Sequence, residues 1–241
     1  MMSKNLSAVL LTFPLAFTFY SANCQTAEEI IMHSVNAVGG KALLNNIHSI
    51  IYEGVSSVMG NDLPTTLTVV QGKGFKAIST FNGMDIISCF TDKTGWMINP
   101  AQGLSTALPL PGDAVKAAQQ SLTIVPLLYI YQNLGYTAAL TGNENINGIN
   151  AWKIKLGKEY FNITYFIDPS SWYVLRTETH AITNGTDVTS IVTFSNYKKT
   201  DIGYIIPYTT ESSNMGYDVT VNYTRITFNP VVDLSIFNMP Q

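Results

Sequence analysis

A long series of short strand-like segments constrains this chain more than any other feature of its sequence. Twelve segments show apolar and polar alternation or enrichment in β-branched and aromatic residues. Asn-Gly at 82–83 and again at 147–148 separates neighbouring segments, and this dipeptide between apolar runs is a strong hairpin signal. Hairpin turns without intervening helices predict an antiparallel sheet, and about a dozen strands in one sheet should curl towards a barrel. The segments are 49–57, 65–71, 75–80, 84–90, 95–98, 137–143, 149–156, 161–167, 174–182, 187–197, 204–210 and 218–228.

Two helical regions interrupt the strand pattern. Thr26 followed by Glu29 predicts a capping box at the start of a first helix, which Gly39-Gly40 should end. Residues 113–135 carry apolar residues at helical spacing around Pro126, so we expect two short helices that meet there. This region is too apolar for a free surface helix. It therefore forms either a lid over a cavity or a static part of the core.

Composition excludes several classes of function. Charged residues make up 12% of the chain, about half of the average share, while 46% of the residues are hydrophobic. Disordered chains combine low hydrophobicity with high net charge, which is the opposite of this composition. With a net charge of −3, the chain also lacks the cationic field that nucleic-acid phosphates need.

The N-terminus has the features of a secretory signal peptide. Lys4 precedes an apolar run over 10–20, and small residues follow at 21–24. We expect cleavage after Cys24, which leaves residues 25–241 as a single domain in the periplasm without a transmembrane span. The alternative is a lipoprotein acylated on Cys24. Asn23 argues against it, because that position of a lipoprotein signal calls for a small residue.

The sequence contains no recognisable catalytic or metal-binding motif. Its three histidines do not form a His-Glu-x-x-His pair, and no nucleophile elbow or phosphate-binding loop is present. Cys89 lies in a strand-like segment without a basic neighbour, so we expect a buried and unreactive thiol. We therefore expect no enzyme activity, no cofactor and no metal.

Bulky apolar residues occur on both faces of the segment 160–167, where a strand with one wet face would alternate. One explanation is a central strand covered by helices on one side. The other is a cavity lined by adaptable aromatic and methionine side chains, suited to an apolar ligand. The candidate cavity and lid residues are Phe75, Met84, Phe90, Trp96, Leu122, Leu127, Leu128, Tyr131, Leu134, Phe161, Tyr165, Val192 and Phe194.

Several short motifs, in order, resemble the outer-membrane lipoprotein-sorting proteins of Bacteroidetes, which are relatives of the LolA and LolB carriers. They are AVGG at 37–40, YFIDPSSWYVLR at 165–176, FSNYKK at 194–199, DIGYIIPY at 201–208, FNP at 228–230 and LSIFNMP at 234–240. The resemblance implies a mainly β (α+β) fold, a half-open antiparallel barrel of about 11 strands with an N-terminal helix and a central helical lid. One departure is Lys76, where the best-known carriers have an arginine that holds the lid closed.

The leading functional prediction is a periplasmic carrier or binder of lipoprotein acyl chains or other lipids in an apolar cavity. The alternative is an envelope sensor or protein-interaction module on the same fold, which would have an envelope protein as its partner. An enzyme acting on a lipid or glycan is the third hypothesis, and it lacks a catalytic group in the sequence.

Overall fold

The structure is a computed structural model, and it describes residues 25–158, 161–183, 186–214 and 217–240. The predicted signal peptide, residues 1–24, lies outside the described residues. Among those that are described, no helix is long and apolar enough to cross a membrane.

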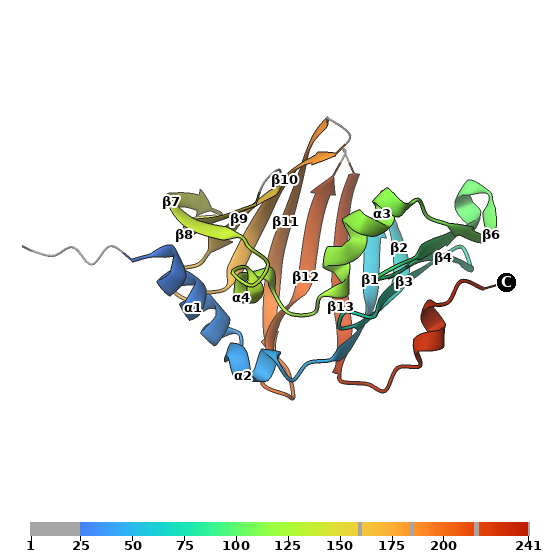
Figure 1. Ribbon diagram of the computed structural model, residues 1–241, viewed down its shortest axis with the longest axis horizontal. Coiled ribbons are helices and arrows are strands. Elements are labelled where there is room, and N and C mark those ends of the chain that lie inside the picture. The colour runs from blue at the N-terminus through green and yellow to red at the C-terminus, as the bar shows by residue number, and fades with distance from the viewer. Residues whose placement is uncertain (1–24, 159–160, 184–185, 215–216, 241) are drawn as a thin grey trace, which may run out of the picture.

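One antiparallel sheet of thirteen strands forms the body of the molecule (Figure 1). Its order is β6-β5-β4-β3-β2-β1-β13-β12-β11-β10-β9-β8-β7, so the pairing of β1 with β13 joins two meanders. β6 and β7 are the edges, and the sheet is open rather than closed into a barrel. The strands are β1 Ser49–Val58, β2 Asn61–Val70, β3 Gly74–Phe81, β4 Met84–Thr91, β5 Gly95–Asn99, β6 Leu104–Pro109, β7 Thr137–Ile146, β8 Ile149–Lys158, β9 Phe161–Ile167, β10 Val174–Thr183, β11 Thr186–Lys199, β12 Ile205–Asn214 and β13 Tyr217–Phe228.

The count of about 11 strands that the resemblance implied was wrong, because the sheet has thirteen. Of these, β6 is the one that is absent from the twelve segments expected from the sequence. Its end overlaps the Leu-Pro-Leu-Pro-Gly run at 108–112, which we interpreted as a breaker. Leu108 nevertheless pairs with Met97, and Pro109 pairs with Trp96. Proline has no N–H to donate to a ladder, and an edge strand tolerates it because one side of that strand needs no partner.

The join between the two meanders depends on a glycine. The register of β1 against β13 shifts between Glu53 and Gly54. A Cβ on Gly54 would lie 2.2 Å from the backbone oxygen of Asn222, so no larger residue fits at this bulge.

The N-terminal helix α1, Ala27–Ala37, begins with the predicted capping box. The Glu29 carboxylate accepts from the N–H of Thr26 at 2.9 Å, and the Thr26 hydroxyl oxygen accepts from the N–H of Glu29 at 3.2 Å. Gly39 has a φ of +132°, which ends α1 and starts the short helix α2, Gly40–Leu44. Ile30, Ile31 and Val35 of α1 are buried in the main core.

The central region crosses one face of the sheet (Figure 1), which we call the inner face. It consists of α3, Gly112–Ala117, the 3-10 helix η2, Ala118–Leu122, and the one-turn helix α4, Leu127–Ile130. Pro126 is the N-cap of α4, so the predicted break at this proline is confirmed. Two further 3-10 helices, η1 Pro100–Gln102 and η3 Leu234–Phe237, follow β5 and β13.

The outer face carries two smaller apolar clusters. In the first, Cys89 and Trp96 are buried against Phe237 of η3. In the second, Phe166 is fully buried with Ile146 and Ala151. Within β9, Tyr165 and Ile167 belong to the main core on the inner side, whereas Phe166 points outward. Both faces of this strand are covered, which explains its lack of apolar and polar alternation.

Candidate functional site

Three adjoining cavities lie between the inner face of the sheet and the segment from α3 to Tyr136. Their volumes are about 170, 390 and 300 Å³. The first and second share Pro126 and Tyr165, and the second and third share Thr123 and Ile124. Ligand sites in proteins typically have about 300–1,000 Å³, so the cavities together have the size of a ligand site.

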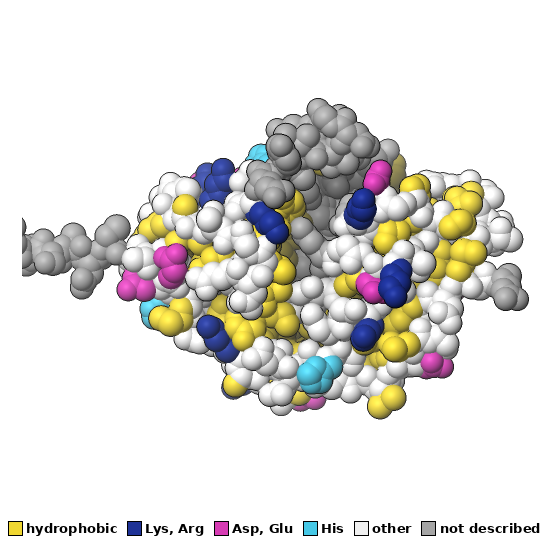
Figure 2. Space-filling view, in the orientation of Figure 1, with side chains coloured by type: hydrophobic (Ala, Val, Ile, Leu, Met, Phe, Trp, Pro, Cys, Tyr) yellow, Lys and Arg dark blue, Asp and Glu magenta, His cyan; other side chains and the backbone are white. Residues whose placement is uncertain are grey.

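The lining of the cavities is uncharged and mostly apolar. Among the described residues, the polar side chains that line them are Ser, Thr and Gln, together with tyrosines, and none is a carboxylate, Lys, Arg or His. The first cavity lies between α1, α4 and strands β9 to β12, and its lining includes Val35, Leu128, Val174 and Phe194. The second lies between α4 and β9, and the third between the residues after η2 and strands β1 to β3 and β11 to β13. Figure 2 shows a hollow on this face between α4 and α3, bordered by hydrophobic side chains.

Tyrosines add ring area to the lining without adding charge. Burial raises the pKa of Tyr204 to about 12, and it also raises the pKa of Tyr165 and of Tyr197. The Tyr197 hydroxyl donates a hydrogen bond to the backbone oxygen of Val174 at 2.7 Å. These phenols therefore stay neutral near neutral pH, and the walls favour hydrocarbon over ions.

The segment over the cavities makes hydrogen bonds to the turn after β2 and to the end of α2. The N–H of Ile124 donates to the side-chain oxygen of Gln71 at 2.7 Å, and the N–H of Gly72 donates to the oxygen of Leu122 at 2.8 Å. At α4, the Tyr129 hydroxyl donates to the side-chain oxygen of Asn45 at 3.0 Å. These hydrogen bonds supplement the apolar contacts between the segment and the residues beneath it.

Six of the candidate residues from the sequence line these cavities. Leu128 and Tyr165 are buried, and Leu134 is 44% exposed at the end of the segment. The six are Phe75, Leu127, Leu128, Leu134, Tyr165 and Phe194.

Five other candidates lie on the same side of the sheet but beside the cavities. Leu122 and Tyr131 are buried in the segment itself. Phe90 and Val192 share the inner face because they pair directly with the cavity residues Phe75 and Thr177. Phe161 contacts the ring of Tyr136, a cavity residue, with 6.0 Å between the centroids.

The placement of the last two candidates does not match our expectation. Met84 is 40% exposed at the β3–β4 hairpin. Trp96 is on the outer face, where its indole N–H donates to the oxygen of Phe237 at 2.9 Å. A period of two separates the faces of a strand but does not say which face is the inner one.

Sequence reasoning missed the contribution of α1 and of several tyrosines. Ser34, Val35 and Val38 line the first cavity, and they continue the buried helical stripe of Ile30 and Ile31. The sequence showed this stripe, but it did not show which surface of the protein the stripe packs against. Tyr136 was missed because it falls between two predicted segments, and Tyr204 because it is the first residue of one.

We compared Lys76 with the arginine that holds the lid closed in the best-known carriers. In this structure Lys76 lies on the outer face, away from the segment over the cavities. Its ammonium donates to the oxygen of Ile236 at 3.2 Å and sits 5.4 Å from the Trp96 ring centroid on the outer face. Nearby, the Cys89 thiol donates to the oxygen of Phe237 at 3.5 Å. The prediction of a buried cysteine is confirmed, and burial raises the pKa of the Cys89 thiol to about 11, which disfavours the reactive thiolate.

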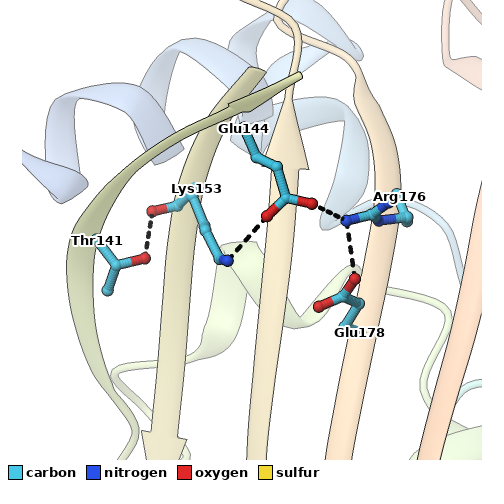
Figure 3. Close-up of polar contacts among 5 residues, drawn as sticks. All are labelled: Thr141, Glu144, Lys153, Arg176 and Glu178. Atoms are coloured by element: carbon cyan, nitrogen blue, oxygen red, sulfur yellow. Dashed lines mark hydrogen bonds and ion pairs between the residues drawn. The ribbon is translucent and has the colours of Figure 1, made fainter. Parts of the chain in front are cut away.

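Figure 3 shows a charged cluster on the outer face, formed by Glu144, Lys153, Arg176 and Glu178. Its two cations lie over the ring of Phe166. Glu144 accepts from Lys153 at 2.9 Å and from Arg176 at 2.5 Å, and Arg176 also pairs with Glu178 at 2.8 Å. The Arg176 guanidinium lies 4.1 Å from the centre of the Phe166 ring. The hydrogen bond from Lys153, followed by that from Arg176, lowers the pKa of Glu144. Each carboxylate is thus paired with a cation, and the charges of the cluster balance.

The described residues include no group of three or more His, Cys, Asp or Glu side chains placed to share a metal ion. The inner face offers a set of partly open, uncharged cavities with a mostly apolar lining.

Comparison with known proteins identifies the fold. No family model matches the chain, and no curated protein matches it. Among solved structures, an outer membrane lipoprotein-sorting protein domain from Vibrio parahaemolyticus is 16% identical, with a TM-score of 0.55 over 88% of this chain and 96% of that one. A LolA superfamily protein from Nitrosomonas europaea is 12% identical, with a TM-score of 0.57 over 89% of this chain and 98% of that one. The fold is LolA-like.

A DUF1329 family protein from Desulfovibrio piger has the same LolA-like fold. It is 14% identical, with a TM-score of 0.57 over 88% of this chain and 97% of that one. At these identities the similarity concerns the fold, and what the cavities bind is a separate question.

Proposed function

We propose that this protein is a periplasmic carrier or binder of acyl chains, taken either from lipoproteins or from other lipids. The observation that carries the proposal is the set of three adjoining, uncharged cavities beneath the segment from α3 to Tyr136. The LolA-like fold of the structural neighbours supports it, and the signal-like N-terminus supports export.

The energetics of such a site agree with this proposal. Each CH₂ group moved from water into an apolar environment contributes about 0.8 kcal/mol. A chain of a dozen carbons therefore gains several kcal/mol even after losing conformational freedom. The described residues that line the cavities include no charged group that would have to be desolvated when the chain enters.

The segment over the cavities gives a route for entry. Single hydrogen bonds join it to Gln71 and Gly72 in the turn after β2 and to Asn45 at the end of α2. A typical hydrogen bond contributes about 1 kcal/mol net, so breaking one of these bonds costs about as much as the burial of one or two CH₂ groups returns. Buried side chains of the segment such as Leu128 add to the cost when they leave the core, and an entering acyl chain would have to replace their contacts.

Native mass spectrometry of the protein purified from its own periplasm tests this proposal. We expect a population with one bound lipid, and we expect the delipidated protein to bind a fluorescent fatty-acid probe with one-to-one stoichiometry. Protein that is free of lipid and does not bind the probe would contradict the proposal. A stable complex with one envelope protein, unaffected by lipid, would instead favour the interaction-module alternative.

A further inference from the structure

The strand β8 places a lysine in line with the apolar wall of the inner face. Trp152, Ile154 and Leu156 alternate along β8 and pack in the main core. Lys158 is the next residue in this alternation, so it continues the same face. Lys155 is exposed and lies on the other face.

Lys158 lies beside the end of the second cavity. Its ammonium donates to the backbone oxygen of Leu134 at 2.8 Å and lies 5.8 Å from the centre of the Tyr136 ring. Leu134 and Tyr136 both line that cavity, and Leu134 is partly exposed. The opposite residue on β9, Phe161, contacts Tyr136. A basic group therefore lies where the apolar wall reaches solvent.

The ammonium of Lys158 retains capacity for an anion. It has three N–H donors, and Leu134 accepts from one of them. No carboxylate of the described residues lies within ion-pair distance of Lys158, in contrast to Lys153, which pairs with Glu144. Figure 2 shows Lys or Arg side chains on both sides of the hollow on this face.

We propose that the ligand is an amphiphile whose acyl chain carries an anionic headgroup, a carboxylate or a phosphate, and that Lys158 binds this headgroup. The chain would then pass Leu134 and Tyr136 into the second cavity and continue towards Tyr165, which it shares with the first cavity. This inference rests on the proposed function and narrows it, since neutral lipids lack the group that Lys158 recognises.

Competition against a fluorescent fatty-acid probe tests the inference with ligands of one chain length. The ligands are dodecanoate, dodecyl phosphate and dodecanol, at a pH well above the carboxylate pKa. We expect at least one anion to bind about fivefold more tightly than dodecanol, which is the strength of a well-formed exposed ion pair. The preference should shrink at high salt, because exposed charges are screened. Comparing the two anions distinguishes a carboxylate from a phosphate headgroup.

Substitutions at Lys158 assign the effect to this residue. Lys158→Gln should remove the preference for the anion and leave dodecanol binding unchanged, whereas Lys158→Arg should retain the preference. Lys155→Gln, on the other face of β8, is the matched control and should behave like the wild type. Equal binding of anion and alcohol by the wild type, or an equal loss of both in Lys158→Gln, would overturn the inference while leaving the proposed function intact. Failure of all three ligands to displace the probe would overturn both.

Discussion

The side-chain oxygen of Gln71 accepts a hydrogen bond from the backbone N–H of Ile124 at 2.7 Å, which joins the turn after β2 to the segment that covers the cavities. Ile124 lines both the second and the third cavity. The contact therefore lies where the segment passes from one cavity to the other. It fixes the non-helical connection 123–126 between η2 and α4.

Gln71→Ala should loosen the cover without unfolding the sheet. The substitution leaves the Ile124 N–H without its acceptor, at a cost of about 1 kcal/mol. We expect amide exchange at Ile124 to become about fivefold faster and bound acyl probe to dissociate faster. Lys73→Ala, an exposed change in the same turn, is the control. Unchanged exchange at Ile124 would show that the contact does not hold the cover.

Phe237→Ala should make Cys89 reactive. In the wild type, burial and a raised pKa of about 11 keep the thiol protonated, so alkylation should be slow near neutral pH. Removing the ring uncovers Cys89 and Trp96 and should cost about 3–5 kcal/mol of stability. We expect labelling of the folded protein to become at least about tenfold faster, while Met239→Ala, at an exposed position nearby, leaves it slow.

The milder variant Phe237→Leu covers the case in which Phe237→Ala does not fold. It should give an intermediate labelling rate with most of the stability retained. Rapid labelling of the wild-type protein would contradict the account of this cluster.

The charged cluster on the outer face should contribute a pH-dependent part of the stability. Hydrogen bonds from Lys153 and Arg176 lower the pKa of Glu144 below its ordinary value of 4.5. A carboxyl whose pKa is lower in the folded state stabilises the protein above the unfolded pKa, and this stability is lost as the pH falls through the folded pKa.

Urea unfolding of Glu144→Gln measures that contribution. Because the cluster is partly exposed, we expect a loss of about 0.5–1 kcal/mol at neutral pH. The difference from the wild type should shrink as the pH falls below about 4.5. A difference that stays constant with pH would mean that packing on Phe166, rather than the charge of Glu144, is responsible.

Local sequence signals predicted much of the fold. The capping box at Thr26, the break at Pro126 and twelve of the strands follow from periods, caps and turn residues that act over a few neighbours. β6 was missed because its own signal was masked by prolines, and its existence depends on pairing with β5.

The site was less predictable, because it depends on which face of each strand turns inward. Phe75 and Trp96 look alike as aromatic residues in strands, yet Phe75 lines one of the three inner cavities and Trp96 lies on the outer face. The difference arises from η3, which covers the outer face of β3 to β5 and lies far from them in sequence. The part played by α1 was missed for the same reason, since no local pattern says which surface a helix will cover.

The most direct test of the central claim, that the inner cavities bind an acyl chain, is the affinity for a fluorescent fatty-acid probe in a cavity-filling variant. Ile163 lines the second cavity from β9, and Ile191 lies on β11 outside the three cavities, so Ile163→Trp and Ile191→Trp form a matched pair. Filling the space should weaken probe binding by about tenfold or more in Ile163→Trp, with a change in Tm of only a few degrees, because the added ring occupies empty volume. Ile191→Trp should bind the probe as the wild type does. Equal probe affinity in both variants and the wild type would contradict the claim.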